Sequence, residues 1–247
     1  MMNLFNHLGK YLMLLAVTLR KPEKASIYRH QIIVEMDNLG LNSLGIVAII
    51  SVFMGAVLTI QTAFNTDHPL LPIYAVGYAV RQATVLEFAP TIISLILAGK
   101  VGSSIASEIG TMRVTEQIDA LEIMGVNAAG YLILPKMIAA MVINPLLIII
   151  SMFLGILGGW AVAYLTPVIS LSHYMYGVLY QYSGYDISYA MIKTVIFAFL
   201  ITSISGYFGF FTSGGALEVG QSSTKAVVFS SIFIILFNLI LTQLLLA

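Results

Sequence analysis

The segment GKVGSS, which begins at Gly99, is the part of this sequence that looks most like a site for chemistry. Glycine-rich loops with a lysine bind nucleotide phosphates, but they need four residues between two glycines and then Lys followed by Ser or Thr. Here no glycine stands five residues before Gly99, and Val101 follows Lys100. The segment also follows a long apolar run rather than a β-strand pattern. We therefore exclude a nucleotide site in this chain.

Metal and redox chemistry find little support in the sequence. The chain has no cysteine, which excludes disulfides, thiol catalysis and thiolate metal sites. Its four histidines lack the spacing of metal ligands, and we interpret each as a loop or interface residue: His7, His30, His68 and His173. No cofactor is expected.

Hydrolytic catalysis requires a convergent set of side chains, such as Ser with His or two carboxylates. Ser103 and Ser104 have no histidine near them in the sequence, and Glu87 stands alone in an apolar run. We expect no catalytic residue and no enzymatic activity in this chain.

The composition places the chain in a membrane. Only 9% of the 247 residues are charged and 59% are hydrophobic, whereas a soluble domain usually has about 25% charged residues. The polar side chains are too few to cover a water-soluble globule. The formal net charge of zero argues against a nucleic-acid partner.

The long apolar runs predict an all-α membrane protein that forms one membrane domain over residues 1–247. A spanning helix needs about 20 apolar residues, and five segments reach this length: about 41–64, 83–102, 134–165, 187–211 and 225–246. The third segment is too long for one straight span, so we expect it to tilt or to extend beyond the bilayer. No internal repeat or low-complexity linker divides the chain.

Before the first span, residues 3–21 have the pattern of an amphipathic helix, with apolar residues at helical spacing: Leu4, Leu8, Tyr11 and Leu15. We expect this helix to lie in the membrane interface. An uncleaved signal sequence is the weaker alternative, because most basic residues follow the apolar run and no small-residue cleavage site comes next.

The basic residues predict the orientation, since cytoplasmic segments carry an excess of Lys and Arg. With the N-terminus in the cytoplasm, nine basic residues lie on the cytoplasmic side: Lys10, Arg20, Lys21, Lys24, Arg29, Lys100, Arg113, Lys136 and Lys225. Only Arg81 and Lys193 lie toward the outer side. Five spans then place the C-terminus outside and residues 103–128 in a cytoplasmic loop.

The loop at 103–128 has the pattern of two short surface helices. We expect a break at Gly110 and Thr111 and a helix end at Gly125. Physical reasoning leaves two interpretations open, a solvated loop helix or a docking helix whose apolar ridge fits a groove on a cytoplasmic partner. The apolar ridge recurs at steps of three and four residues: Ile105, Ile109, Met112, Val114, Ile118, Leu121 and Met124.

Two charged residues lie several residues inside the ends of predicted spans, and a charge costs about 2.5–3.5 kcal/mol at the bilayer centre. Glu87 and Lys193 either extend outward to the interface or face a cavity in the outer half of the membrane, where an ion pair could join them. Glycines in the spans mark close helix contacts, either within the chain or between subunits: Gly55, Gly155, Gly158 and Gly159.

Residues 86–140 read LEFAPTIISLILAGKVGSSIASEIGTMRVTEQIDALEIMGVNAAGYLILPKMIAA. This run is similar to the MlaE-type permeases, the membrane subunits of ABC transporters that work with MCE proteins in lipid transport. The shared pattern has E-x-x-P, then A-G-[KR]-x-G-[SA], then E-I-G-x-M and E-Q. The similarity covers nearly the whole chain. Two positions depart from it, since Leu86 stands where many members have a basic residue and Asn238 where relatives often have aspartate.

The resemblance implies two functional regions. The loop at 103–128 would be the coupling segment that rests on a separate ATPase, with polar contacts from Glu108, Arg113, Glu116, Gln117, Asp119 and Glu122. A substrate cavity would include Glu87, Pro90, Lys193 and Asn238.

The expected function is therefore that of a permease subunit in the inner membrane. It would move phospholipid or a related lipid between that membrane and an MCE-domain protein on the outer side, as a homodimer powered by an ATPase partner. The alternative is a secondary transporter or channel for a hydrophobic solute, a class that should show inverted repeats or paired ionisable residues at the midplane.

Overall fold

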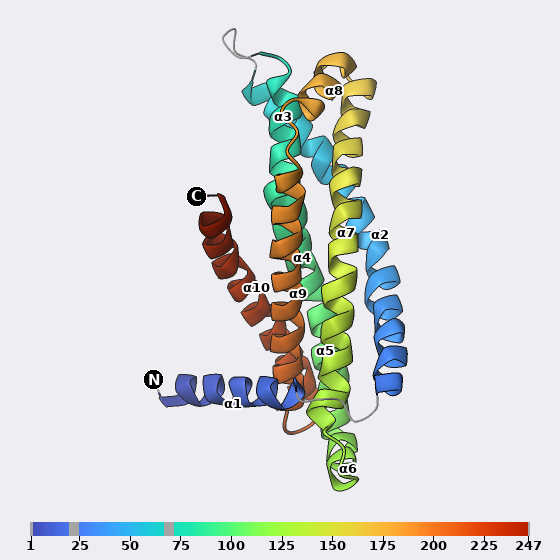
Figure 1. Ribbon diagram of the computed structural model, residues 1–247, viewed down its shortest axis with the longest axis vertical. Helices are drawn as coiled ribbons and strands as arrows, with labels where there is room; N and C mark the ends of the chain where they lie inside the picture. Colours follow the sequence, from blue (N-terminus) through green and yellow to red (C-terminus); the bar gives the residue numbers. More distant parts are fainter. Residues whose placement is uncertain (1, 20–24, 67–71, 247) are drawn as a thin grey trace. The chain divides into compact units, whose positions relative to one another are not determined.

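The computed structural model describes residues 2–19, 25–66 and 72–246, and every regular element in these ranges is a helix (Figure 1). Five helical stretches are long and apolar enough to cross a membrane: Tyr28–Asn65, Ala75–Val114, Ala128–Leu165, Gly184–Phe210 and Ala216–Leu245. The predicted all-α class with five long apolar helices is confirmed. Among the predicted loop and interface histidines, His68 lies outside the described residues.

The residues cluster into two compact units, each built from separate parts of the chain. Unit 1 contains residues 1–42, 95–144 and 195–247, and unit 2 contains residues 43–94 and 145–194. The long helices α2 (Ala25–Asn65), α7 (Ala128–Leu165) and α9 (Gly184–Phe210) contribute residues to both units.

In unit 2, glycines bring α2 and α7 into backbone contact. A Cβ atom on Gly55 would lie 1.8 Å from the Gly155 carbonyl oxygen, and one on Gly158 would lie 2.0 Å from that of Val52. Only residues without side chains permit this approach, which is typical of helix pairs in membranes. Of the two interpretations of these glycines, contact within the chain is the one that the structure confirms.

Two short helices, α3 (Ala75–Gln82) and α8 (Leu171–Leu179), pack together in unit 2. The Tyr174 hydroxyl donates to the Ile156 carbonyl at 3.0 Å, and burial raises the pKa of Tyr174 to about 12. Arg81 is buried and donates to the carbonyl oxygens of Val178 and Tyr180, each at 2.9 Å. The guanidinium therefore satisfies carbonyl groups that the end of α8 leaves without helical partners.

In unit 1, α1 (Met2–Thr18) runs crosswise to α5, α10 and the adjoining end of α9 (Figure 1). Two polar contacts hold it on α9, between His7 and the Tyr207 hydroxyl at 2.7 Å and between the Tyr11 and Ser203 hydroxyls at 2.9 Å. The helix expected over 3–21 is present, although residues 20–21 lie outside the described part of the chain. Its position in the membrane interface stays a prediction.

Small residues also allow α5 (Ser103–Val114) to approach α9 and α10 (Ala216–Leu246). A Cβ atom on Gly209 would lie 2.9 Å from the Ala106 carbonyl oxygen, and Ser223 donates its hydroxyl to the Ser103 carbonyl at 3.2 Å. The carboxylate of Glu218 accepts the Gly215 N–H at 2.8 Å, which caps the start of α10.

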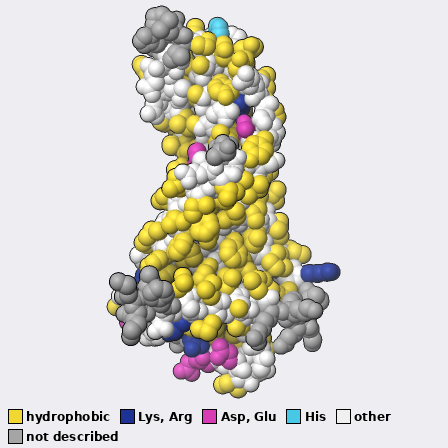
Figure 2. Space-filling view, turned by 60° about the vertical axis from the view of Figure 1, so that its left-hand side comes forward, with side chains coloured by type: hydrophobic (Ala, Val, Ile, Leu, Met, Phe, Trp, Pro, Cys, Tyr) yellow, Lys and Arg dark blue, Asp and Glu magenta, His cyan; other side chains and the backbone are white. Residues whose placement is uncertain are grey.

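Much of the apolar side-chain surface faces outward. In the most hydrophobic stretch of α10 only 17% of the residues are buried, and in that of α2 only 28%. Figure 2 shows a face on which hydrophobic side chains predominate and charged side chains are few. Such a surface suits lipid rather than water.

Candidate coupling and substrate sites

Two short helices form the polar segment predicted at 103–128, and the first of them is the last part of the second candidate span, Ala75–Val114. They are α5 (Ser103–Val114) and α6 (Gln117–Ile123). The predicted break at Gly110 and Thr111 is wrong, because α5 continues through both residues. Gly110 packs against Thr212 and Val219, where a Cβ atom would lie 3.2 and 3.3 Å from their side chains.

The actual turn between α5 and α6 lies at Glu116, which has a φ of 62°. A left-handed conformation costs a non-glycine residue about 1–2 kcal/mol. The end of α6 is simpler, because Gly125 takes a φ of 79°. Its N–H bonds the Glu122 carbonyl and the Val126 N–H bonds the Leu121 carbonyl, which is the Schellman arrangement. The predicted helix end at Gly125 is confirmed.

The apolar ridge of the segment divides into a buried part and an exposed part. Ile105, Ile109 and Ile118 are almost fully buried and seat both helices on the rest of unit 1. At the end of α6, Ile123 is 87% exposed and Met124 is 67% exposed. The exposed pair forms an apolar tip on an otherwise polar segment, and the sequence pattern singled out only Met124.

The six polar residues assigned to the coupling segment have different surroundings. Arg113 and Asp119 form an ion pair at 2.6 Å that joins α5 to α6. The Glu108 carboxylate accepts a hydrogen bond from Lys136 at 2.8 Å. The other three are exposed to solvent: Glu116, Gln117 and Glu122.

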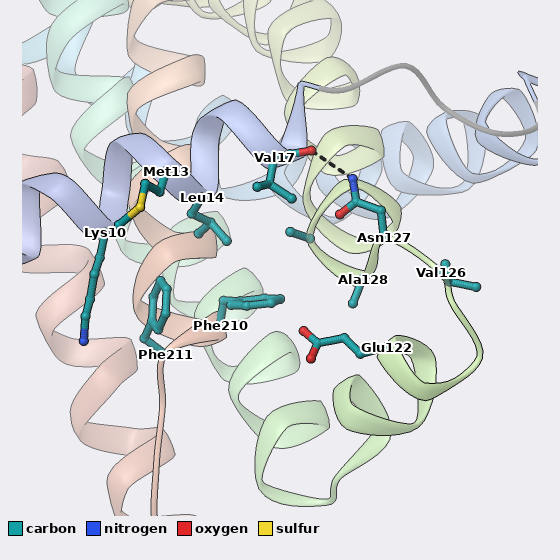
Figure 3. A pocket seen from close by; sticks show the side chains of 11 residues that line it. Lys10, Met13, Leu14, Val17, Glu122, Val126, Asn127, Ala128, Phe210 and Phe211 are labelled. Atoms are coloured by element: carbon teal, nitrogen blue, oxygen red, sulfur yellow. Dashed lines mark hydrogen bonds between the residues drawn. The ribbon is translucent and has the colours of Figure 1, made fainter.

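A cavity of about 460 Å³ lies beside α6, where α1 crosses the start of α7 and the end of α9 (Figure 3). Met13, Leu14 and the rings of Phe210 and Phe211 make its wall largely apolar. The Glu122 carboxylate points into it (Figure 3). The Asn127 side chain donates to the Val17 carbonyl at 2.9 Å and ties α1 to the start of α7.

In unit 2, Glu87 and Lys193 form an ion pair at 3.0 Å. The sequence left this pair open, because both residues lie inside predicted spans toward the outer side. The Lys193 side chain is fully buried, whereas that of Glu87 is 45% exposed. Lys193 also donates to the Tyr189 hydroxyl at 2.9 Å, and Thr91 donates to the Glu87 carboxylate at 3.2 Å. No sequence pattern singles out Tyr189 or Thr91, although each lies one helical turn from a charged residue.

The helix that contains Pro90 supplies a further acceptor for Lys193. Pro90 lies in η1 (Ala83–Ile92), a π-helical stretch of the second candidate span. Because proline has no N–H, Pro90 cannot bond the Leu86 carbonyl four residues before it as a residue of an α-helix would. Lys193 donates to that carbonyl at 3.3 Å. Glu87 and the residue before it thus supply a carboxylate and a carbonyl acceptor to one buried ammonium group.

This arrangement leaves one half of the ion pair accessible. Lys193 has three acceptors and no solvent contact, so it serves to hold Glu87 in place. The half-exposed carboxylate can still accept hydrogen bonds from an ammonium or hydroxyl group of a ligand. Asn238, the fourth residue assigned to the substrate cavity, is partly buried on α10 in unit 1. Its role there stays a prediction.

Comparison with known proteins places these features in one family. The sequence pattern of the family described as Permease MlaE matches residues 32–244, which include both regions. The chain belongs to the MlaE permease family. A probable ABC transporter permease protein of Rickettsia bellii is 35% identical over 99% of this chain and 98% of its own length.

Other relatives of this MlaE permease come from photosynthetic organisms. A probable ABC transporter permease protein of Synechocystis is 34% identical over 88% of this chain and 82% of its own length. The chloroplastic protein TRIGALACTOSYLDIACYLGLYCEROL 1 of Arabidopsis thaliana is 33% identical over 89% of this chain and 63% of its own length.

The family decides the broad function. The chain is a multi-pass membrane protein and the permease subunit of an ABC transporter, so ATP is hydrolysed by a partner subunit and not by this MlaE permease. Membership of this family rules out the alternative of a secondary transporter or channel.

Proposed function

We propose that this MlaE permease moves phospholipid or a related lipid between the inner membrane and an MCE-domain protein on the outer side. The observation that carries the proposal is the Glu87–Lys193 pair, a half-exposed carboxylate held within a candidate membrane span. Ionisable residues inside membrane spans are rare and commonly mark substrate pathways, and the exposed part of this carboxylate is accessible to a polar lipid head group. The name of the Arabidopsis relative contains a galactolipid, which favours a lipid as the transported molecule.

The coupling segment is the proposed docking site for the ATPase. The exposed apolar tip of Ile123 and Met124 suits a groove on the partner, and Glu116 and Gln117 would make polar contacts around it. Since Arg113 and Asp119 pair with each other, they hold α6 on α5 in addition to any contact with the ATPase.

The proposed orientation has the N-terminus in the cytoplasm and the C-terminus in the periplasm. Two basic residues, Arg81 and Lys193, oppose the charge bias that supports it. Both have partners within the protein, since Arg81 donates hydrogen bonds to carbonyl groups and Lys193 forms an ion pair with Glu87. The exposed apolar faces of α2 and α10 leave surface for a second permease subunit, and a homodimer is part of the proposal.

Purification in mild detergent followed by reconstitution tests the lipid proposal. We expect an ATPase and an MCE-domain protein to co-purify, mass spectrometry to find phospholipid in the complex, and fluorescent phospholipid to move only with hydrolysable ATP. A non-hydrolysable analogue is the control. Lipid movement driven by an ion gradient without ATP, or ATP-driven movement of a water-soluble solute alone, would contradict the proposal.

Charge reversal tests the docking site. Glu116→Lys is expected to weaken ATPase binding at least about tenfold, equal to 1.4 kcal/mol, since this exposed carboxylate lies at the turn next to the apolar tip. The double variant Arg113→Asp with Asp119→Arg can restore the ion pair in reverse, so it separates the attachment of α6 to α5 from contacts of these two residues with the ATPase. Unchanged ATPase binding by Glu116→Lys would remove Glu116 from the docking site.

A further inference from the structure

Lys136 joins three helices of unit 1 through one buried ammonium group. It lies on α7, and its side chain is only 5% exposed. Its Nζ donates to the Glu35 carboxylate of α2 at 2.6 Å and to the Glu108 carboxylate of α5 at 2.8 Å. From the sequence, Lys136 is only one of the cytoplasmic basic residues, and the family resemblance assigns Glu108 to the ATPase surface.

The two carboxylates differ in their surroundings. The Glu35 side chain is 18% exposed, whereas that of Glu108 is 51% exposed. The contact with Glu35 therefore lies inside the unit, and the contact with Glu108 lies at its edge. A buried ion cluster is seldom the most stable way to fill a core, because apolar residues of equal volume often stabilise as well or better. This cluster instead fixes how α2, α5 and α7 lie relative to one another around Lys136.

The Lys136 cluster is connected to α6 through α5. The ion pair between Arg113 and Asp119 attaches α6 to α5, and Glu108 stands slightly more than one helical turn before Arg113 on α5. A displacement of α6 is therefore carried into α5. At Glu108 the displacement of α5 acts on Lys136, which is hydrogen-bonded to Glu108 on α5 and to Glu35 on α2.

We propose that Lys136 is a positioning residue that transmits movement of the coupling helices to α2 and α7. The inference rests on the proposed function, in which the ATPase acts on α5 and α6. Glu108 then acts inside the permease, as the α5 side of this joint, rather than as a contact to the ATPase.

Transport per ATP is the readout that separates this role from a structural one. In the reconstituted complex we expect Lys136→Met to bind the ATPase and hydrolyse ATP as the wild type does. The amount of fluorescent phospholipid moved per ATP should fall at least about tenfold, while the conservative Lys136→Arg should recover much of it. Lys225→Met is the matched control, since Lys225 is an exposed lysine on α10, and it should leave the ratio unchanged.

Glu108→Gln keeps the test decisive if Lys136→Met does not fold. It removes one charge at the half-exposed edge of the cluster, and we expect the same loss of transport per ATP with normal ATPase binding. An unchanged ratio in either folded variant would overturn the inference. Loss of ATPase binding by Glu108→Gln would also overturn it, because Glu108 would then belong to the docking surface. If the wild-type complex itself moves no lipid, the proposed function fails instead.

Discussion

At the residue scale, the difference in exposure between Glu87 and Lys193 predicts unequal effects of removing them. Lys193 is fully buried, so it depends on the carboxylate for charge compensation. Glu87 is 45% exposed and can be solvated if the lysine is removed. The pair is therefore held together mainly because the lysine needs a counter-ion.

Substitution of each partner tests this asymmetry. Glu87→Gln should lower the free energy of unfolding by about 3 kcal/mol, because it leaves a buried ammonium without its counter-ion. Lys193→Met should cost about 1 kcal/mol or less, since methionine fills a similar volume. Thermal or denaturant unfolding in detergent measures both, and the double variant should be less destabilised than the sum of the two. Equal costs for the two single variants would contradict the prediction.

At the element scale, glycines determine where helices end and how closely they approach. The sequence predicted the end of α6 correctly because a glycine after the last apolar residue has one common use. It predicted a break between two short helices but placed it at Gly110 and Thr111 rather than at Glu116. There Gly110 allows close helix packing and Glu116 forms the turn. A glycine is the more common turn residue, so the residue types alone indicate the wrong position.

Gly125→Ala is expected to destabilise the end of α6. Its φ of 79° costs an alanine about 1–2 kcal/mol, so the apolar tip should lose part of its order. We expect weaker ATPase binding, measured by titration of the purified ATPase. The control is Gly220→Ala, because a Cβ atom on Gly220 in α10 meets nothing within 4 Å. Equal ATPase affinity for the two variants would show that the C-terminal turn of α6 is not needed for docking.

Gly55→Ala is expected to separate α2 from α7 in unit 2. The added methyl group would meet the Gly155 carbonyl, and overpacking of this kind costs about 1–3 kcal/mol or more. Gly45→Ala in the same helix has no neighbour within 4 Å and should be neutral or stabilising by up to about 1 kcal/mol. Unfolding in detergent compares them, and similar stabilities would refute the close α2–α7 contact.

At the scale of the whole molecule, orientation is the property that most needs a direct measurement. The natural chain has no cysteine, so single cysteines can be introduced without a prior deletion. Ile123 is 87% exposed and Tyr182 is 61% exposed, and both should accept the substitution with little loss of stability.

We expect a membrane-impermeant thiol reagent to label Tyr182→Cys in intact spheroplasts and to label Ile123→Cys only after lysis. The charge bias places α6 in the cytoplasm and the segment between α8 and α9 outside. Labelling of detergent-solubilised protein provides the control for reactivity at each position. The reverse pattern in spheroplasts would invert the proposed topology.

The sequence by itself determined the membrane class, the helical architecture and the alternation of apolar and polar residues at 103–128. These properties depend on the composition and on the spacing of residues that are close together in the sequence. Only the tertiary structure showed that Lys193 donates to the Leu86 carbonyl, that Gly55 meets Gly155, and that Lys136 binds Glu35 and Glu108. Each of these depends on contacts between residues far apart in the sequence. Because a lysine, glutamate or glycine suits several environments, its residue type does not specify the partner that folding places beside it.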